Sequence, residues 1–185
     1  MKEASNTKPL ISELEIHHRI SQLAKEIAGN FSVGNMVLMV VLKGGFIFAA
    51  DLLRRLHGRG LDPAVEFIRA SSYGEGEKST GKVEISIDTS RDLKGMQVLI
   101  VDDIIDSGRT LKAMSEYIWT KSPVSIQSCT LLDKPSRREV DFSVDYAGFE
   151  IPDIFVVGYG LDLGQNFRFL PFIGTVEADK QNKPK

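Results

Sequence analysis

Apolar and polar residues follow one another along this chain in two rhythms, one typical of strands and one typical of helices. Two uninterrupted apolar runs, at 36–42 and 97–101, are typical of strands that are covered on both faces. Further stretches with the alternating or apolar pattern of strands lie at 64–70, 82–88, 125–132 and 154–159. The chain is therefore expected to form a sheet whose central strands are buried.

Helical patterns stand between these strands. Ser12 and Glu15 have the spacing of a capping box, apolar residues then recur at helical spacing, and Gly29 is a plausible stop. Residues 46–57 and 110–120 also read as helices. Because strand and helix alternate through the middle of the chain, we predict an α/β fold with a mainly parallel sheet flanked by helices.

Composition limits the kind of protein this can be. The 185 residues, 42% of them hydrophobic, suit a single domain with a sizeable core. The net charge of −2 gives no reason to expect a nucleic-acid or membrane partner. The longest apolar run is far shorter than the about 20 residues that span a bilayer. Cys129 is the only cysteine and is expected to be an inert buried thiol. We expect a soluble, cytoplasmic protein.

Candidate chemistry is concentrated in "VLIVDDIIDSGRTL", residues 98–111. An apolar strand runs into Asp102, Asp103 and Asp106, and ligands of open α/β sheets bind beyond the carboxyl ends of strands. The turn that follows opens a helix, whose N–H groups can bind a phosphate, and Gly108 lets the backbone approach an anion. Carboxylates beside a phosphate cradle suit a sugar phosphate and Mg²⁺. The alternative, a helix-capping Asp106 with two solvated neighbours, explains one carboxylate but not three.

Two other phosphate signatures fail on their context. "GEKSTGKV" (76–83) nearly spells a P-loop, but Val83 stands where a Ser or Thr should bind Mg²⁺, and a strand pattern follows. "GYGLDLG" (158–164) has its third glycine one position late for a dinucleotide-binding motif.

The 98–111 stretch closely resembles the phosphoribosyl-diphosphate (PRPP) binding motif of the type I phosphoribosyltransferases. Further blocks, in order, resemble the hypoxanthine-guanine phosphoribosyltransferases, and the match covers roughly residues 30 to 170. These blocks are "LKGG" (42–45), "FIRASSYG" (67–74) with "STG" (79–81), "LLDKPSRR" (131–138), and "GFEIPDIFVVGYGLD" (148–162) with "FR" (167–168). One departure is Asp102, since the family often has Glu there.

The resemblance implies a fold, a reaction and partners. The fold is a parallel-sheet core at about 34–150 with a small hood from 1–33 and 151–176, before a frayed tail at 177–185. The reaction is purine salvage, in which PRPP and hypoxanthine or guanine give IMP or GMP and diphosphate, with Mg²⁺ required. Because the family is oligomeric, a homodimer or homotetramer is expected.

Residue roles also follow from the resemblance. Asp102 and Asp103 would meet the ribose hydroxyls and Mg²⁺, and Asp106 would exchange a proton with purine N7. A second group would hold the phosphates: Asp106, Ser107, Gly108, Arg109 and Thr110 at the 5′-phosphate, and Lys43, Gly44 and Arg168 at the diphosphate. In the family the peptide that corresponds to Leu42–Lys43 can be cis.

The remaining roles concern the base and the closure of the site. Lys134 would donate to the 6-oxo group, Phe155 would stack on the purine, and the Val156 backbone would contact the exocyclic position. Asp162 would lie near a second Mg²⁺ and the base. Ser72 and Tyr73 would belong to a lid, which has a purpose because water destroys a ribosyl cation-like state.

Alternatives stay open at the level of sequence. Lys134 and Arg168 could be surface residues, Phe155 could be core, and Tyr73 could be a solvated loop aromatic. The enzyme could prefer xanthine. A PRPP-sensing regulator that binds RNA or DNA would keep the 98–111 motif, but it would add a basic face or a DNA-binding domain, and this chain has neither.

Overall fold

A six-stranded sheet forms the centre of the molecule in the computed structural model, which describes residues 7–72, 83–87 and 89–176. The strand order is β4-β3-β2-β5-β6-β7. Strands β2, β3, β5, β6 and β7 are parallel, and β4 pairs antiparallel with β3 at the edge. The bounds are β2 Met36–Val41, β3 Ala64–Ser72, β4 Val83–Ile87, β5 Gln97–Ile105, β6 Ser125–Asp133 and β7 Tyr146–Glu150. The predicted fold class, a mainly parallel sheet flanked by helices, is confirmed.

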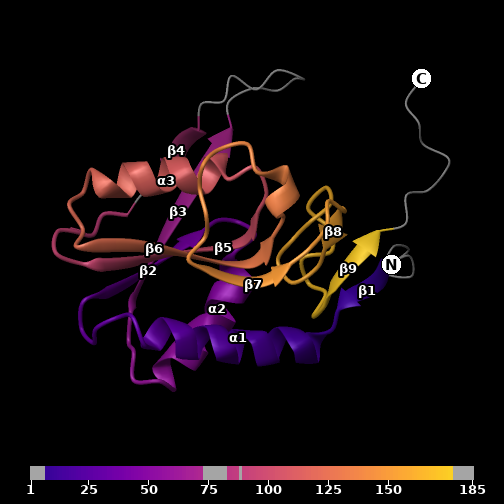
Figure 1. The fold of residues 1–185 in the computed structure, drawn as a ribbon, viewed down its shortest axis with the longest axis horizontal. Coiled ribbons are helices and arrows are strands. Elements are labelled where there is room, and N and C mark those ends of the chain that lie inside the picture. Colours follow the sequence, from indigo (N-terminus) through magenta and orange to yellow (C-terminus); the bar gives the residue numbers. More distant parts are fainter. Residues whose placement is uncertain (1–6, 73–82, 88, 177–185) are drawn as a thin grey trace.

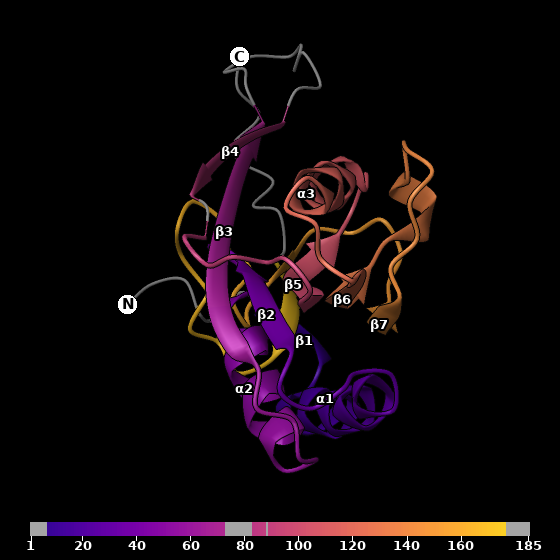
Figure 2. The same cartoon turned by 90° about the vertical axis from the view of Figure 1, so that its left-hand side faces the viewer.

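Helices cover both faces of this sheet. Helices α1 (Glu13–Ala28) and α2 (Phe46–His57) lie on one face, and α3 (Arg109–Trp119) lies on the other (Figures 1 and 2). The central strand β5 shows why residues 98–101 are all apolar. Leu99 and Val101 belong to the core on the α1 and α2 side, whereas Val98 and Ile100 belong to the core under α3. Burial on both faces leaves no position for a polar residue.

The first helix begins where the sequence predicts. The backbone N–H of Ser12 donates to Glu15 Oε2 at 2.8 Å, and the backbone N–H of Glu15 donates to Ser12 Oγ at 3.3 Å. This reciprocal pair is the predicted capping box, and it satisfies N–H groups that the first turn leaves without a helical partner. The helix ends at Ala28, and Gly29 follows as predicted.

The end of β5 differs from the prediction in a way that matters for the site. The strand was expected to end at 101, but it continues to Ile105. Its ladder with β6 persists through the pairs Asp102–Thr130, Ile104–Leu132 and Ile105–Asp133. Backbone hydrogen bonds between strands do not require apolar side chains. The strand can therefore continue after the apolar run ends at residue 101. The first two carboxylates therefore stand within the strand and not after it.

A second, smaller sheet joins the two ends of the described chain. Its order is β1-β9-β8, all antiparallel, with β1 at Thr7–Ile11, β8 at Val156–Val157 and β9 at Ile173–Val176 (Figure 1). The strand predicted at 154–159 shrinks to β8, because Gly158 turns the chain with φ 98°. Strands β1, β7 and β9 were missed, since each is short and lacks a sustained alternating or apolar run.

Some predictions are not decided by the described residues. The division into a core and a hood stays a prediction, although β8 and β9 fall in the segment assigned to the hood. Most of the expected loop at 71–81 and the expected tail at 177–185 lie outside the described residues. Within the described part of the chain, no helix is both long and apolar enough to cross a membrane.

Candidate active site

Three strands deliver the candidate residues to one edge of the sheet. Strands β2, β5 and β6 run parallel, so the segments after Val41, Ile105 and Asp133 emerge side by side. A cavity of about 200 Å³ opens there. It is lined by Asp102, Asp103, Ile104, Ile105, Asp106, Ser107, Gly108, Thr110 and Leu111. The 98–111 stretch thus builds a hollow by itself.

The two adjacent carboxylates are the most buried charges in this hollow. Asp102 is only 8% exposed. Its Oδ1 accepts the N–H of Asp103 at 2.9 Å, and Asp103 Oδ1 accepts the N–H of Ile104 at 3.0 Å. Burial raises the pKa of both groups, and the neighbouring charge of Asp103 raises the pKa of Asp102 further. Arg168 acts in the opposite direction on the pKa of Asp103. The pair is thus poised to take donors or a cation.

Glycines bring the loop after β2 directly onto this pair. A Cβ at Gly44 would lie 1.8 Å from Asp103 Oδ2, so any other residue would force the Asp103 carboxylate to move. Gly160, with φ 103°, approaches from the other side, and a Cβ there would lie 2.2 Å from the Gly44 carbonyl oxygen. The Leu42–Lys43 peptide is cis, as the family resemblance allows. Lys43 and Gly44 therefore lie between the β5 carboxylates and the 158–168 segment.

Arg168 and Asp162 enter the site as a pair. Their side chains lie 2.6 Å apart, with 20% and 25% of each exposed. Arg168 also donates to the Gly160 carbonyl at 2.6 Å, and Asp162 Oδ2 accepts the Gln165 N–H at 2.8 Å. Arg168 is thus partly buried and held by several contacts, and it also acts on Asp103.

The turn after β5 has the geometry of an anion cradle. Gly108 is the N-cap of α3 with φ 81°, and no side chain caps this helix. The alternative in which Asp106 caps the helix is therefore wrong. Ser107 Oγ accepts the N–H of Arg109 at 3.4 Å, and Thr110 is exposed at the first turn. The Arg109 side chain lies 2.7 Å from Glu139, whose backbone N–H donates to the Ser107 carbonyl at 3.0 Å, so its guanidinium is engaged in an ion pair beside the turn.

Asp106 is contacted by two arginines to which the sequence analysis gave no role, one at its side chain and one at its backbone carbonyl. Arg137, on a 3₁₀ turn at Pro135–Arg137, contacts Asp106 Oδ1 at 3.0 Å and Asp153 at 3.6 Å. Arg138 donates to the Asp106 carbonyl and to the Asp133 carboxylate. The sequence contained a signal for these two arginines, because both belong to the "LLDKPSRR" block that carries the family resemblance.

Lys134 and Phe155 now have definite surroundings. Lys134 is only 7% exposed, so it is not the surface lysine of the alternative. Its backbone N–H donates to the Ile105 carbonyl at 3.0 Å. Phe155 is 56% exposed, so it is not a core residue, while Val156 is buried in β8. Ser72 ends β3, and Tyr73 lies outside the described residues.

The side chains that could bind a metal ion limit the kind of metal site that can form here. In the described ranges 7–72, 83–87 and 89–176, no group of three or more His, Cys, Asp or Glu side chains could enclose an ion. Mg²⁺ is often held by only one or two carboxylates together with substrate phosphates. Asp102 and Asp103, buried beside a phosphate cradle, fit such an ion.

Comparison with known proteins agrees with this geometry. The phosphoribosyl transferase domain matches residues 11–163 of the sequence. The chain belongs to the phosphoribosyltransferase family.

Within this family, the chain is similar to enzymes that are named for hypoxanthine or for hypoxanthine and guanine. The chain is 48% identical over 169 residues to the hypoxanthine phosphoribosyltransferase of Salmonella typhimurium, covering 90% of this chain and 93% of that one. It is 45% identical over 180 residues to the hypoxanthine-guanine phosphoribosyltransferase of Aquifex aeolicus, covering 96% and 99%. A crystal structure of the Bacillus anthracis hypoxanthine-guanine enzyme superposes with a TM-score of 0.86 at 44% identity, covering 92% and 98%.

The raised pKa of Asp102 predicts a gain in stability when its charge is removed. A carboxyl whose pKa is higher in the folded than in the unfolded state favours folding below its ordinary value of 3.8, and this contribution is lost as the pH rises toward the raised value. Asp102→Asn should therefore raise the melting temperature at pH 7, in EDTA, by at least about 2 °C, and the gain should shrink toward pH 4.

Asp141→Asn is the matched control, because Asp141 is exposed and lies outside the site. Scanning calorimetry of the two variants at several pH values measures the difference. A lower melting temperature for Asp102→Asn at pH 7 would show that the buried charge does not strain the folded state.

Proposed function

We propose that the protein is a purine-salvage enzyme that transfers the 5-phosphoribosyl group of PRPP to hypoxanthine or guanine, releasing diphosphate and forming IMP or GMP. One observation carries the proposal: buried Lys134 lies next to the carboxyl end of β5, where Asp102 and Asp103 adjoin a phosphate-binding turn. This arrangement combines a ribose-phosphate site with a donor for an oxo group.

The ribose phosphate would occupy the hollow at the end of β5. Asp102 and Asp103 would accept hydrogen bonds from the ribose hydroxyls, and residues Asp106 to Thr110 would bind the 5′-phosphate through N–H groups at the start of α3. Backbone groups of Lys43 and Gly44 would bind the diphosphate, with Arg168 in support. Mg²⁺ would be held by Asp102, Asp103 and Asp162, and it would supply positive charge that offsets the charge of the leaving diphosphate.

Asp162 has a condition attached to its role. Its carboxylate is paired with Arg168 at 2.6 Å in the described conformation. For Asp162 to contact a second Mg²⁺ or the base, this ion pair must first break. Breaking it would also free the Arg168 side chain to bind the diphosphate.

The purine would lie on the other side of the ribose. Lys134 is the donor for the 6-oxo group, because an ammonium only donates and a carbonyl only accepts. Phe155 is exposed and free to stack on the ring, and the Val156 backbone would contact the exocyclic position. Asp106 would take or share the N7 proton as N9 attacks. Its present partner Arg137 would have to yield that carboxylate.

Further features of the proposal concern conditions and surroundings. Ser72 and Tyr73 belong to the proposed lid, which would exclude water from the ribosyl cation-like state. We propose a cytoplasmic enzyme without nucleic-acid or membrane partners.

The test is a panel of four bases with PRPP and MgCl₂. Hypoxanthine and guanine should give nucleotide and diphosphate at rates far above those with adenine, because adenine offers an amino donor to Lys134 in place of an acceptor. Preference for xanthine would shift the substrate within the same class. Preference for adenine would refute the role of Lys134. Salt-dependent nucleic-acid binding without turnover would indicate a regulator instead.

Asp106→Asn tests the acid–base role. An amide keeps the shape but cannot accept the N7 proton, so kcat should fall by about 10² or more while the Kd for PRPP stays within about threefold. Steady-state kinetics and calorimetric titration with PRPP measure the two quantities. Asp153→Asn is the control, because Asp153 also contacts Arg137 but has no role in the site. An unchanged kcat for Asp106→Asn would remove Asp106 from proton transfer.

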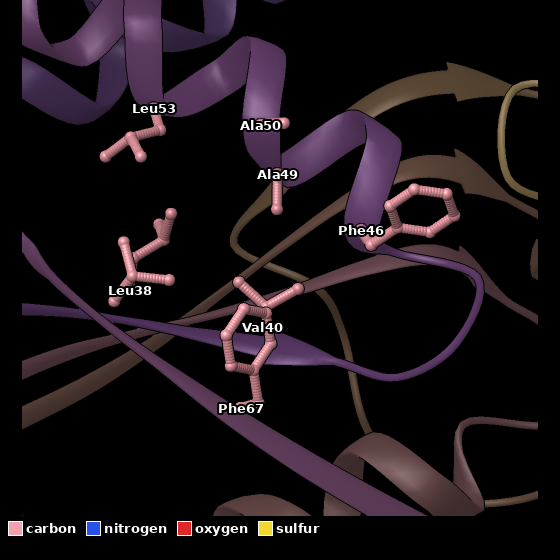
Figure 3. Close-up of a pocket in the computed structure, with 8 residues that line it drawn as sticks. Leu38, Val40, Phe46, Ala49, Ala50, Leu53 and Phe67 are labelled. Atoms are coloured by element: carbon pink, nitrogen blue, oxygen red, sulfur yellow. The ribbon is translucent and has the colours of Figure 1, made fainter.

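We further propose that the chain forms a homodimer or homotetramer through the groove between α2 and the β2–β3 face. The groove holds about 170 Å³ and is lined by apolar side chains only (Figure 3). They are Leu38, Val40, Phe46, Ala49, Ala50, Leu53, Val65 and Phe67. Phe46 and Phe67 are 45% and 46% exposed, which is typical of a surface that another protein covers. A two-fold interface can set such a ring into the same hollow of a second copy.

Phe67→Lys should convert the oligomer to monomer, because a lysine cannot be buried in an apolar groove without a partner. Val33→Lys is the control, since Val33 is 74% exposed and lies outside the groove. Analytical ultracentrifugation of the three proteins gives the masses. A monomeric parent protein would refute the oligomer, and an oligomeric Phe67→Lys would place the interface elsewhere.

A further inference from the structure

One buried hydroxyl stands out within the part of the chain that the structure describes. Thr130, in β6, is 0% exposed, and its Oγ1 has no hydrogen-bond partner there. No other buried side-chain nitrogen or oxygen among the described residues lacks a partner. Buried polar groups are almost always hydrogen-bonded, so this exception calls for a reason.

The position of Thr130 in the sheet points to the reason. Thr130 is the in-register partner of Asp102 on the adjacent strand. Neighbouring strands lie about 4.8 Å apart, and in-register residues project to the same face of the sheet. The residues on either side, Cys129 and Leu131, belong to the core on the α1 and α2 side. Thr130 therefore projects to the α3 face, where Asp102 lines the cavity.

Asp102 needs such a neighbour. Its Oδ1 accepts the Asp103 N–H at 2.9 Å, and its carboxyl group also interacts with the Asp103 side chain, so both contacts come from the next residue of its own strand. Because χ2 of aspartate is broad, a contact from the neighbouring strand would fix the carboxylate plane further. A threonine on a strand has few χ1 choices, so its hydroxyl stands at a nearly fixed point. A donor at that point would set the plane of the carboxylate.

We propose that Thr130 is a positioning residue: its hydroxyl donates a hydrogen bond to the Asp102 carboxylate when that carboxylate holds the ribose hydroxyls of PRPP. The inference rests on the proposed function, and it assigns no chemical step to Thr130. The strand ladder fixes where the hydroxyl is, and the hydroxyl fixes how Asp102 faces the sugar.

Two variants separate the hydroxyl from the shape of the side chain. Thr130→Val keeps the volume and removes the hydroxyl, whereas Thr130→Ser keeps the hydroxyl. Thr130→Val should raise the KM and the Kd for PRPP by about tenfold, with kcat within about threefold, because one hydrogen bond to a charged group is lost. Thr130→Ser should stay within about threefold of the parent protein in all three quantities.

Stability gives a readout that does not depend on substrate or metal. Without PRPP or Mg²⁺, Thr130→Val should melt no lower than the parent protein, because it removes an unpartnered polar group from the interior. Ser128→Ala is the control on the same strand. Ser128 is 2% exposed, and its hydroxyl donates to Asp145 at 2.9 Å, so this variant should melt lower and leave the KM for PRPP unchanged.

The outcomes are distinct. A Thr130→Val protein with the KM and Kd of the parent protein would overturn the inference, and so would a Thr130→Ser protein as impaired as Thr130→Val. If Thr130→Val does not fold, Thr130→Ala replaces it in the same comparison with Thr130→Ser. A parent protein that neither binds PRPP nor forms nucleotide would overturn the proposed function itself, and the inference with it.

Discussion

The constraint on which the site depends is the continued pairing of β5 with β6 past the end of the apolar run. The ladder reaches Ile105, so Asp102 and Asp103 are held by a buried strand and not by a loop. A strand fixes backbone positions far more tightly than a loop does, but it also removes water from both carboxylates. Their raised pKa values are the physical sign of that cost. The pairing of β5 with β6 thus both fixes the position of the two carboxylates and makes their charged form unfavourable.

The rest of the site is arranged around this pair at close range. Gly44 lies directly against Asp103, and Gly160 lies directly against Gly44, so three chain segments meet with no room for a side chain between them. Tyr159, next to Gly160, donates its hydroxyl to Asp51 in α2. That bond ties the 158–168 segment to the helix that follows the Lys43–Gly44 loop. A shift in either segment would therefore be transmitted to the carboxylates through packed backbone.

Much of this could be predicted from sequence, and the failures have identifiable reasons. The apolar runs gave β2 and β5, and the capping residues gave α1, because both signals are local. The extent of β5 past residue 101 depends on a partner strand, and β1, β7 and β9 are short strands that owe their pairing to neighbours distant in sequence. The contact of Arg137 with Asp106 and the lack of a partner for the Thr130 hydroxyl also depend on segments distant in sequence. The Asp162–Arg168 pair spans only six residues, but the apolar pattern carries no information on which charged side chains meet. Phe155 shows the limit of pattern reading, since it precedes a buried strand and yet is 56% exposed.

The charges around the hollow are unevenly satisfied, and this has a consequence for binding. Asp106 and Asp162 each have an arginine partner, whereas Asp102 and Asp103 are buried against backbone N–H groups and each other, with Arg168 acting on Asp103 from a greater distance. A ligand that brings hydroxyl donors or positive charge to Asp102 and Asp103 removes a strain that the free protein carries, and it gains affinity by doing so. A ligand that approaches Asp106 or Asp162 must first displace an arginine. Asp102 and Asp103 are therefore the carboxylates at this edge that a ligand can reach without breaking an arginine ion pair.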